Sequence, residues 1–393
     1  MSAQLAPDPG PAQPTPETRP RPAKRRTGRR ILARVIVLMM STCLALLLGE
    51  VALRFLWRNP YVSEGTDAYL HLRIQPTQVD FPVDRSTIDP KLKPTRFRTT
   101  ERSYVAPSGQ HAQPRATVAF LGGSTTECMA VDESLRFPAL VSDLLNEKGL
   151  QVNTLNGGVS GNTLHDSLNN LINHVVNDRP DFVVVMNVAN DVGLLAADGD
   201  YHSREAEPLS WGTWADWSKH ELSRRSSLFG LVRHATAGIQ IEVNDRDKLA
   251  WRNDPARADK ANADQYRARV RAFVAAAQGL GIQPILMTEP LSGARNSLTP
   301  DWADMGAQDR FNSIVRQVAA ETNTPLFDLA QHLADHVPDW DQPGVVFYDG
   351  MHVHDEGSRI YARFVADQLV PLIQARSADQ PPKSSTDSTQ PSP

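Results

Sequence analysis

The strongest constraint on the fold is an alternation of short β-branched runs with helical stretches that begins after Ala116. Apolar runs of strand length are separated by longer segments with helical periodicity, such as "RFPALVSDLLNEKG". Alternation of this kind predicts a parallel sheet with helices on both of its faces. Five strands are expected within one domain, residues 116–375, and they are "TVAFL", "QVNTLN", "DFVVVMN", "IQPILMTE" and "TPLFDL".

A polar stretch at about residues 196–264 interrupts this alternation and lacks a strand pattern, which predicts an inserted lid or cap. It contains Trp211, Trp214 and Trp217, three residues apart and therefore close to one helical face. Rings placed in this way can stack on a sugar or enter a membrane interface, although packed core is the commoner use of such a stripe. Both interpretations remain open from the sequence.

The N-terminal part of the chain predicts a membrane anchor. Residues 1–30 are rich in proline and poor in large apolar side chains, so a disordered tail is expected there. The uncharged stretch from Val35 to Gly49 is somewhat short for a bilayer span, but the charged residues at its ends can snorkel, so one transmembrane helix is expected over residues 31–57. Residues 58–115 follow as a polar juxtamembrane segment. Basic residues before the span put the N-terminus in the cytoplasm and the rest of the chain outside, so a single-pass protein of the cytoplasmic membrane is expected. The low-complexity residues 376–393 predict a second disordered tail.

A cleaved signal peptide is the alternative, because its charged and apolar regions look much the same. No small-x-small cleavage site follows the apolar run directly, which favours a retained anchor. The net charge of -4 gives the chain no overall basic field, so nucleic acid is not expected as a partner of the chain as a whole. Of the two cysteines, Cys43 lies in the apolar stretch and Cys128 in the predicted domain, so no disulfide is expected between them.

Side chains capable of chemistry follow four of the predicted strands. Ser124 follows the first strand, Gly161 the second and Asn190 the third, while Asp349 and His352 follow the fifth. In an open α/β sheet, functional groups gather beyond the carboxyl ends of the strands. A serine needs a neighbouring base to become a nucleophile, and that base needs a partner that fixes its tautomer. The backbone N–H groups of Ser124 and Gly161, with the Asn190 amide, are candidate donors to a developing oxyanion.

Each residue also has an ordinary structural interpretation: a turn glycine, a strand-end turn or a helix N-cap. Their joint occurrence at successive strand ends favours the catalytic interpretation.

A phosphate cradle at "GGST" is disfavoured because no lysine follows the glycines. His352, His354 and Asp349 leave a metal site open, although His354 precedes a predicted helix start and fits a local structural role better. Cys128 is a possible alternative nucleophile, and packing is its commoner role.

The blocks "GGST", "NGGVSGNT", "VAND" and "DGMH" resemble, in this order, the four signature blocks of the SGNH, or GDSL-like, hydrolase superfamily. The resemblance covers essentially residues 116–375 and implies a flavodoxin-like three-layer α/β/α fold and a serine hydrolase without a metal or other cofactor. It makes Ser124 the nucleophile and first oxyanion donor, Gly161 the second donor and Asn190 the third. It makes His352 the base and Asp349 its orienting carboxylate.

Two positions depart from that pattern. Gly123 stands where the name-giving motif has aspartate, a variant associated with membrane-anchored and carbohydrate-acting members, and it removes no catalytic group. Val188 replaces the glycine usually found two residues before the block-three asparagine, which puts the approach of Asn190 to the oxyanion in question.

These observations predict a membrane-anchored serine esterase that acts outside the cytoplasm, on short acyl esters, chiefly acetyl, of a cell-envelope carbohydrate. A lipase or an acyltransferase of the same superfamily is an alternative. Two further classes are a metal-dependent esterase and a non-catalytic envelope protein that binds a glycan.

Overall fold

The computed structural model describes residues 25–57, 72–201, 222–223, 225–236, 262–292, 305–342 and 344–379. The chain divides into two compact units, Met1–Arg58 and Asn59–Pro393.

The described part of the first unit is helix α1 (Arg25–Leu56) and Trp57, and the helix begins within the basic run rather than after it. Its residues Arg30–Leu56, with a mean hydropathy of 2.5 over the most apolar window, are long and apolar enough to cross a membrane. On α1, Arg54 Nε donates to Glu50 Oε1 at 2.9 Å.

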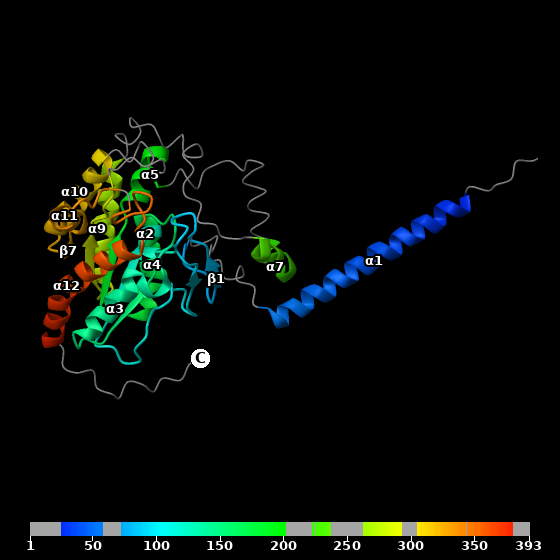
Figure 1. The fold of residues 1–393 in the computed structure, drawn as a ribbon, viewed down its shortest axis with the longest axis horizontal. Coiled ribbons are helices and arrows are strands. Elements are labelled where there is room, and N and C mark those ends of the chain that lie inside the picture. The colour runs from blue at the N-terminus through cyan, green and yellow to red at the C-terminus, as the bar shows by residue number, and fades with distance from the viewer. Residues whose placement is uncertain are drawn as a thin grey trace, which may run out of the picture. The chain divides into compact units, whose positions relative to one another are not determined.

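The second unit, drawn in Figure 1, is built on a five-stranded parallel sheet. The strand order in this sheet is β4-β3-β5-β6-β7. All of the strands predicted from the sequence are present. Short runs of mostly buried residues form them, as expected for strands covered on both faces. Their bounds are β3 (Ala116–Gly122), β4 (Val152–Asn156), β5 (Phe182–Met186), β6 (Gln283–Met287) and β7 (Leu326–Phe327).

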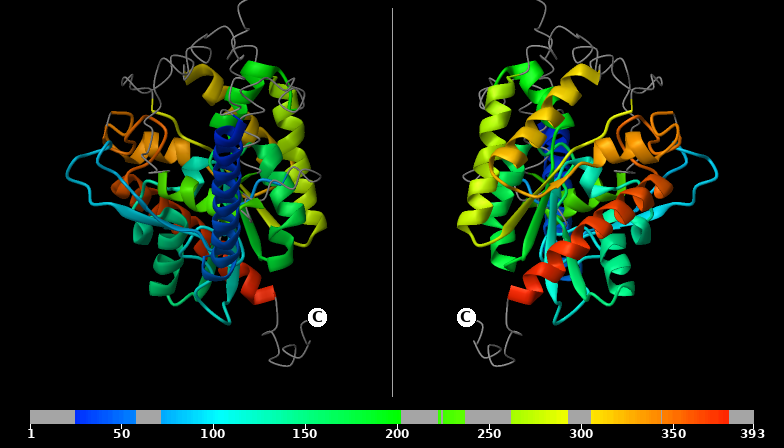
Figure 2. Two further views of the ribbon diagram at one scale, coloured as in Figure 1. Left: turned by 90° about the vertical axis from the view of Figure 1, so that its right-hand side faces the viewer. Right: turned by 90° about the vertical axis from the view of Figure 1, so that its left-hand side faces the viewer.

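Helices cover both faces of this sheet, which confirms the three-layer α/β/α fold (Figure 2). Alternate residues of each strand point to opposite faces, so Val118 of β3 packs on one side and Ala119 on the other. The first layer holds α3 (Phe137–Glu147), α11 (Leu329–His336) and α12 (Asp355–Asp379). The second layer holds α4 (Leu164–Asn173), α5 (Ala189–Asp198), α9 (Ala263–Gly279) and α10 (Met305–Glu321).

Local signals set where several helices begin. Thr163 and Asp166 form a reciprocal capping box at the start of α4. The Asn262 and Asp328 side chains accept from backbone N–H groups in the first turns of α9 and α11. Among the described residues, the other helical elements are α2 (Ser124–Glu127), the 3-10 turns η2 (Glu133–Leu135) and η3 (Val175–Asp178), and α7 (Ser227–Thr236).

The segment before the sheet contains a hairpin that the sequence pattern did not indicate. Strands β1 (Asp80–Val83) and β2 (Thr95–Arg98) pair antiparallel. The buried Arg136 holds the hairpin to the sheet unit, because its guanidinium donates to the carbonyl oxygen atoms of Arg96 and Ala106 at 2.7 and 2.6 Å. The predicted juxtamembrane segment is therefore packed on the α/β domain over the residues described.

Most of the predicted insertion, including Trp211, Trp214 and Trp217, lies outside the described residues, as do most of both predicted tails. The lid and the tails therefore stay predictions. Helix α12 runs to Asp379, slightly beyond the predicted end of the domain at residue 375.

Candidate active site

A serine stands at the start of a short helix directly beyond the first strand of the sheet. Strand β3 ends at Gly122, Gly123 makes the turn, and α2 begins at Ser124. Close packing explains the small residues here, since a Cβ on Gly122 would lie 2.6 Å from the Met186 carbonyl oxygen on β5. The sharp strand-to-helix turn leaves Ser124 half-buried at the carboxyl edge of the sheet.

The structure brings Ser124, His352 and Asp349 into one hydrogen-bonded chain. Ser124 Oγ lies 2.7 Å from His352 Nε2, and His352 Nδ1 lies 2.6 Å from Asp349 Oδ2. The loop that carries the histidine and the aspartate is closed by an antiparallel bridge between Phe347 and Val353. Within it, Asp349 Oδ1 accepts from the backbone N–H of His352 at 2.7 Å, so both carboxylate oxygen atoms are fixed.

This arrangement sets the charge states of the pair. Burial alone raises the pKa of the Asp349 carboxyl, but the His352 charge and hydrogen bonds outweigh burial and hold that pKa below its ordinary value. Burial likewise lowers the pKa of the His352 imidazole, yet the Asp349 carboxylate outweighs it, and the buried carboxyls of Glu289 and Glu127 act in the same direction. The net pKa of His352 is therefore raised above the ordinary histidine value.

The raised pKa gives a prediction for the pH dependence of hydrolysis. With His352 as the predicted base, only its neutral form can accept a proton, so activity is expected to fall as the pH drops through the pKa of this residue. We expect kcat/KM for an uncharged acetyl ester to rise with a midpoint above the ordinary histidine value of about 6.5. A profile of kcat/KM between pH 5 and pH 9 measures this midpoint, and a midpoint below 6 would contradict the prediction.

The two other predicted site residues lie on the neighbouring loops. Gly161 has φ +77° in the loop between β4 and α4. Asn190 lies in the first turn of α5, and its Nδ2 donates to the Asn162 carbonyl oxygen at 3.0 Å. The amide is therefore oriented by the loop that carries Gly161. A primary amide nitrogen carries a second hydrogen for another acceptor.

The two departures from the family pattern both concern Asn190. A Cβ on Gly123 would lie only 2.4 Å from Asn190 Nδ2, so the amide occupies the space that a side chain at position 123 would need. Val188 is buried in the core at the N-terminal end of α5 and does not keep Asn190 away from Gly123. Gly123 thus accommodates the close approach of the amide.

This contact makes Gly123→Ala informative. With Asn190 as a predicted oxyanion donor, we expect the methyl group to displace its amide and to lower kcat by about 10²- to 10³-fold, as for the loss of one such donor. The fold should survive, because the clash is with the end of a flexible side chain. Gly279→Ala, where a Cβ meets nothing within 4 Å, is the matched control. Unchanged kcat in a folded Gly123→Ala protein would mean that Asn190 does not contribute.

Glu289, which follows strand β6, was not singled out from the sequence. It is 4% exposed, and one carboxylate oxygen accepts from Thr125 Oγ1 at 2.6 Å. The other accepts from the backbone N–H groups of Val188 and Ala189 at 2.6 and 2.8 Å. This side chain therefore links the residue after Ser124 to the helix that carries Asn190. Burial raises the pKa of its carboxyl. Its place at a strand end is the signal that would have found it.

Cys128 is a poor candidate for a nucleophile. It is buried, its Sγ contacts the Thr125 carbonyl oxygen, and burial raises the pKa of the thiol to about 12, so thiolate is scarce at neutral pH.

His354 has a local structural role. Its Nε2 bonds to the Gly344 carbonyl oxygen, and its Nδ1 accepts from the N–H groups of Glu356 and Gly357 at the start of α12. Within the part of the chain that the structure describes, no three His, Cys, Asp or Glu side chains group as metal ligands.

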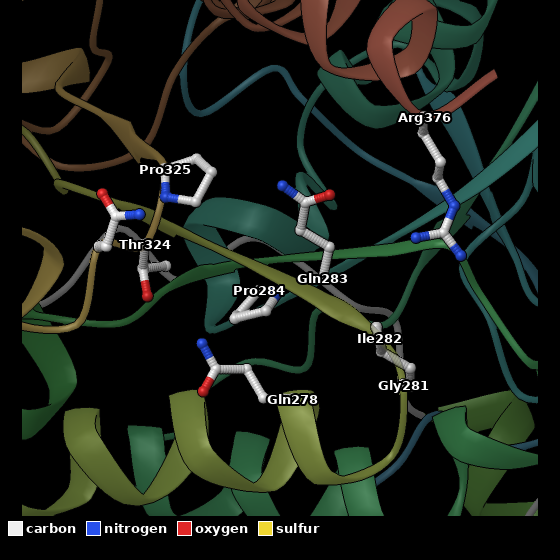
Figure 3. Close-up of a pocket in the computed structure, with 9 residues that line it drawn as sticks. Gln278, Gly281, Ile282, Gln283, Pro284, Thr324, Pro325 and Arg376 are labelled. Atoms are coloured by element: carbon white, nitrogen blue, oxygen red, sulfur yellow. The ribbon is translucent and has the colours of Figure 1, made fainter. Parts of the chain in front are cut away.

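A cavity of about 300 Å³ lies elsewhere, at the amino-terminal ends of β6 and β7 (Figure 3). Gln283, Thr324 and Arg376 are among its lining residues, and Arg376 is paired with Asp181 at 3.1 Å. Ser124 lies at the carboxyl-terminal edge of the sheet, so this cavity is separate from the Ser124–His352 pair.

The chain has similarity to one family of known proteins and to solved structures. No curated protein matches the chain. Among solved structures, an acetylxylan esterase from Geobacillus stearothermophilus is 20% identical, with 65% of this chain and 94% of that chain covered and a TM-score of 0.40. A lipase/acylhydrolase from Enterococcus faecalis is 16% identical, with 65% of this chain and 95% of that chain covered and a TM-score of 0.40.

The profile of the GDSL-like Lipase/Acylhydrolase family matches residues 120–360. Because this match spans more than half of the chain and includes all four motif blocks, the protein belongs to the GDSL-like lipase/acylhydrolase family of serine ester hydrolases.

Proposed function

We propose that this ester hydrolase uses Ser124 as nucleophile, His352 as general base and acid, and Asp349 as the carboxylate that orients the histidine. The observation that carries the proposal is the continuous hydrogen-bonded chain from Ser124 Oγ through His352 to Asp349, with distances of 2.7 and 2.6 Å. In the productive tautomer, His352 Nδ1–H donates to Asp349 and Nε2 accepts from the serine hydroxyl.

The reaction proceeds in two acyl transfers. His352 Nε2 takes the hydroxyl proton as Ser124 Oγ bonds to the ester carbonyl carbon, and it then gives that proton to the departing alcohol. Water next attacks the acyl-enzyme, with its proton going to His352. When the bond from the acyl carbon to Oγ breaks, the carboxylic acid leaves and the proton returns to Ser124. Both steps pass through a tetrahedral intermediate that carries a negative oxygen.

The backbone N–H groups of Ser124 and Gly161 and the Asn190 amide stabilise that oxygen in this proposal. Donors held in place before the reaction are worth more than mobile ones, because no reorganisation is needed as charge develops. The Asn190 amide is held by its bond to the Asn162 carbonyl oxygen at 3.0 Å and by its packing against Gly123.

For the substrate, we propose short acyl esters, chiefly acetyl, on a carbohydrate of the cell envelope. The Gly123 variant of the motif points to the same class by analogy within the family. In this proposal α1 anchors the enzyme in the cytoplasmic membrane, with its N-terminus inside and the catalytic unit outside.

Labelling with a fluorophosphonate probe tests the catalytic part of the proposal. The full chain in detergent should form one adduct, located at Ser124 by peptide mass spectrometry, and Ser124→Ala should form none. The parent should also cleave 4-nitrophenyl acetate faster than the laurate ester and release acetate from an acetylated polysaccharide. A folded parent without an adduct would overturn the nucleophile assignment. A preference for laurate would overturn the substrate class and favour a lipase, while transfer of acetyl to added glycan would indicate an acyltransferase.

A further inference from the structure

We propose that Arg73, which lies in the chain segment before the α/β domain, is a positioning residue that fixes the direction of the Gly161 N–H. This inference rests on the proposed function, in which that N–H stabilises the oxyanion. Arg73 makes two hydrogen bonds to successive carbonyl oxygen atoms of the loop: its Nη2 donates to Ser160 O at 2.8 Å, and its Nη1 donates to Gly161 O at 2.9 Å.

The first of these bonds acts on the peptide group that carries the Gly161 N–H. In a trans peptide the C=O and the N–H point in opposite directions within one plane. With the Ser160 carbonyl held toward the guanidinium, the N–H of Gly161 points away from Arg73. A cation on the carbonyl oxygen also polarises the peptide and makes its N–H a stronger donor.

The loop needs such a device because its backbone has two accessible forms. Residues 159–162 form a turn closed by the Asn162 N–H to the Val159 carbonyl oxygen at 3.0 Å, and Gly161 has φ +77° in it. A positive φ at this third position is type II geometry, and reversal of the central peptide gives a type I turn with the same closing bond. Glycine accepts both forms, so the turn alone does not fix which way its central N–H points.

The rest of the segment holds the same loop from a second side. Gln75 is 4% exposed, and its Nε2 donates to the Gly158 carbonyl oxygen at 2.8 Å and to Glu127 Oε1 at 2.6 Å. The other oxygen of Glu127 accepts from Ser160 Oγ. Glu127 lies at the end of α2, the helix that Ser124 begins. These contacts tie the Gly161 loop to the nucleophile helix.

Asp166 keeps Arg73 in place. Its Oδ2 lies 3.6 Å from Arg73 Nη1, and it also closes the capping box of α4. The Arg73 side chain is 30% exposed, so it lies at the rim of the site rather than in the core. Its loss should therefore affect the loop geometry more than the stability of the fold.

The test compares Arg73→Ala and Arg73→Lys with the parent in the full chain. We expect kcat for an acetyl ester to fall by about 10- to 100-fold in both variants with little change in KM, because the donor is lost in the transition state rather than in substrate binding. Lysine keeps the charge but not the two-pronged geometry, so it should not restore kcat. Methylguanidine should partly restore kcat in Arg73→Ala, and fluorophosphonate labelling should slow in parallel. Arg96→Ala, an exposed arginine of the same segment paired with Asp80, is the matched control.

Unchanged kcat in a folded Arg73→Ala or Arg73→Lys protein would overturn the inference and leave the proposed function standing. A rise in KM at constant kcat would also overturn it, because Arg73 would then bind substrate instead of positioning a donor. A parent that is folded but neither labelled nor active would instead remove the proposed function, and the inference with it. Should Arg73→Ala unfold, the Arg73→Lys variant alone decides the matter.

Discussion

His352→Ala is expected to lower kcat/KM for an acetyl ester by about 10⁴- to 10⁶-fold, the range typical for removal of the base from a serine triad. The hydroxyl of Ser124 then has no acceptor at 2.7 Å, and a neutral alcohol is a weak nucleophile. Steady-state hydrolysis of 4-nitrophenyl acetate measures the loss, and fluorophosphonate labelling should disappear with it. Added imidazole should restore part of the rate if the emptied space admits a base.

His336→Ala is the matched control, since His336 is an exposed histidine on α11 whose ring nitrogen bonds to the backbone of its own helix. It should leave kcat/KM within about twofold of the parent, as for surface substitutions in general. Substantial activity in a folded His352→Ala protein would identify another base, and the buried Glu289 would be the first residue to replace next.

Asp349→Asn is expected to lower kcat by about 10³- to 10⁴-fold while the backbone stays in place. The Asn carbonyl oxygen can still accept from the backbone N–H of His352, which leaves its NH₂ group facing His352 Nδ1. The imidazole must then accept at Nδ1 and carry its proton on Nε2, the wrong tautomer for taking a proton from Ser124. The measurement is kcat as a function of pH.

The same variant should move the acidic midpoint of the pH profile downward. The carboxylate is the main cause that raises the pKa of His352 against burial, so its neutralisation lets burial lower that pKa. Asp367→Asn, which removes a surface carboxylate paired with Lys148, should change neither kcat nor the midpoint. A rate near that of the parent for Asp349→Asn would show that the tautomer is fixed by something else.

The sheet could be predicted because its strands are short runs, buried on both faces and separated by longer helical stretches, a pattern that depends only on local sequence. The β1–β2 hairpin was missed, since "DFPV" contains Pro82 and "TRFR" is too short to show alternation. Its position depends on contacts such as those of Arg136, which no local pattern reports.

The candidate site, like the fold, could be predicted only where local sequence reports it. Ser124, Gly161 and Asn190 were singled out because each lies where a strand ends. The Asp349–His352 pair does not follow strand β7 directly, as the sequence pattern predicted, because α11 comes between them and the pair lies in the loop before α12. Glu289 obeys that rule too, but a single glutamate beside Pro290 carries no recognisable motif. Arg73 was not identifiable, because its partner Gly161 lies 88 positions away and their contact is a property of the folded chain alone.

The loop closed between Phe347 and Val353 makes the base and its carboxylate one local unit of the chain. Every proposed oxyanion donor is encoded before residue 196, and this unit is encoded after residue 346. The long stretch between them contributes none of the five proposed catalytic groups. Evolution can therefore lengthen, shorten or replace the chain between residues 202 and 261 without replacing any of these five groups. Variation in that stretch can change which ester substrates the enzyme accepts, while the residues proposed for the reaction are kept.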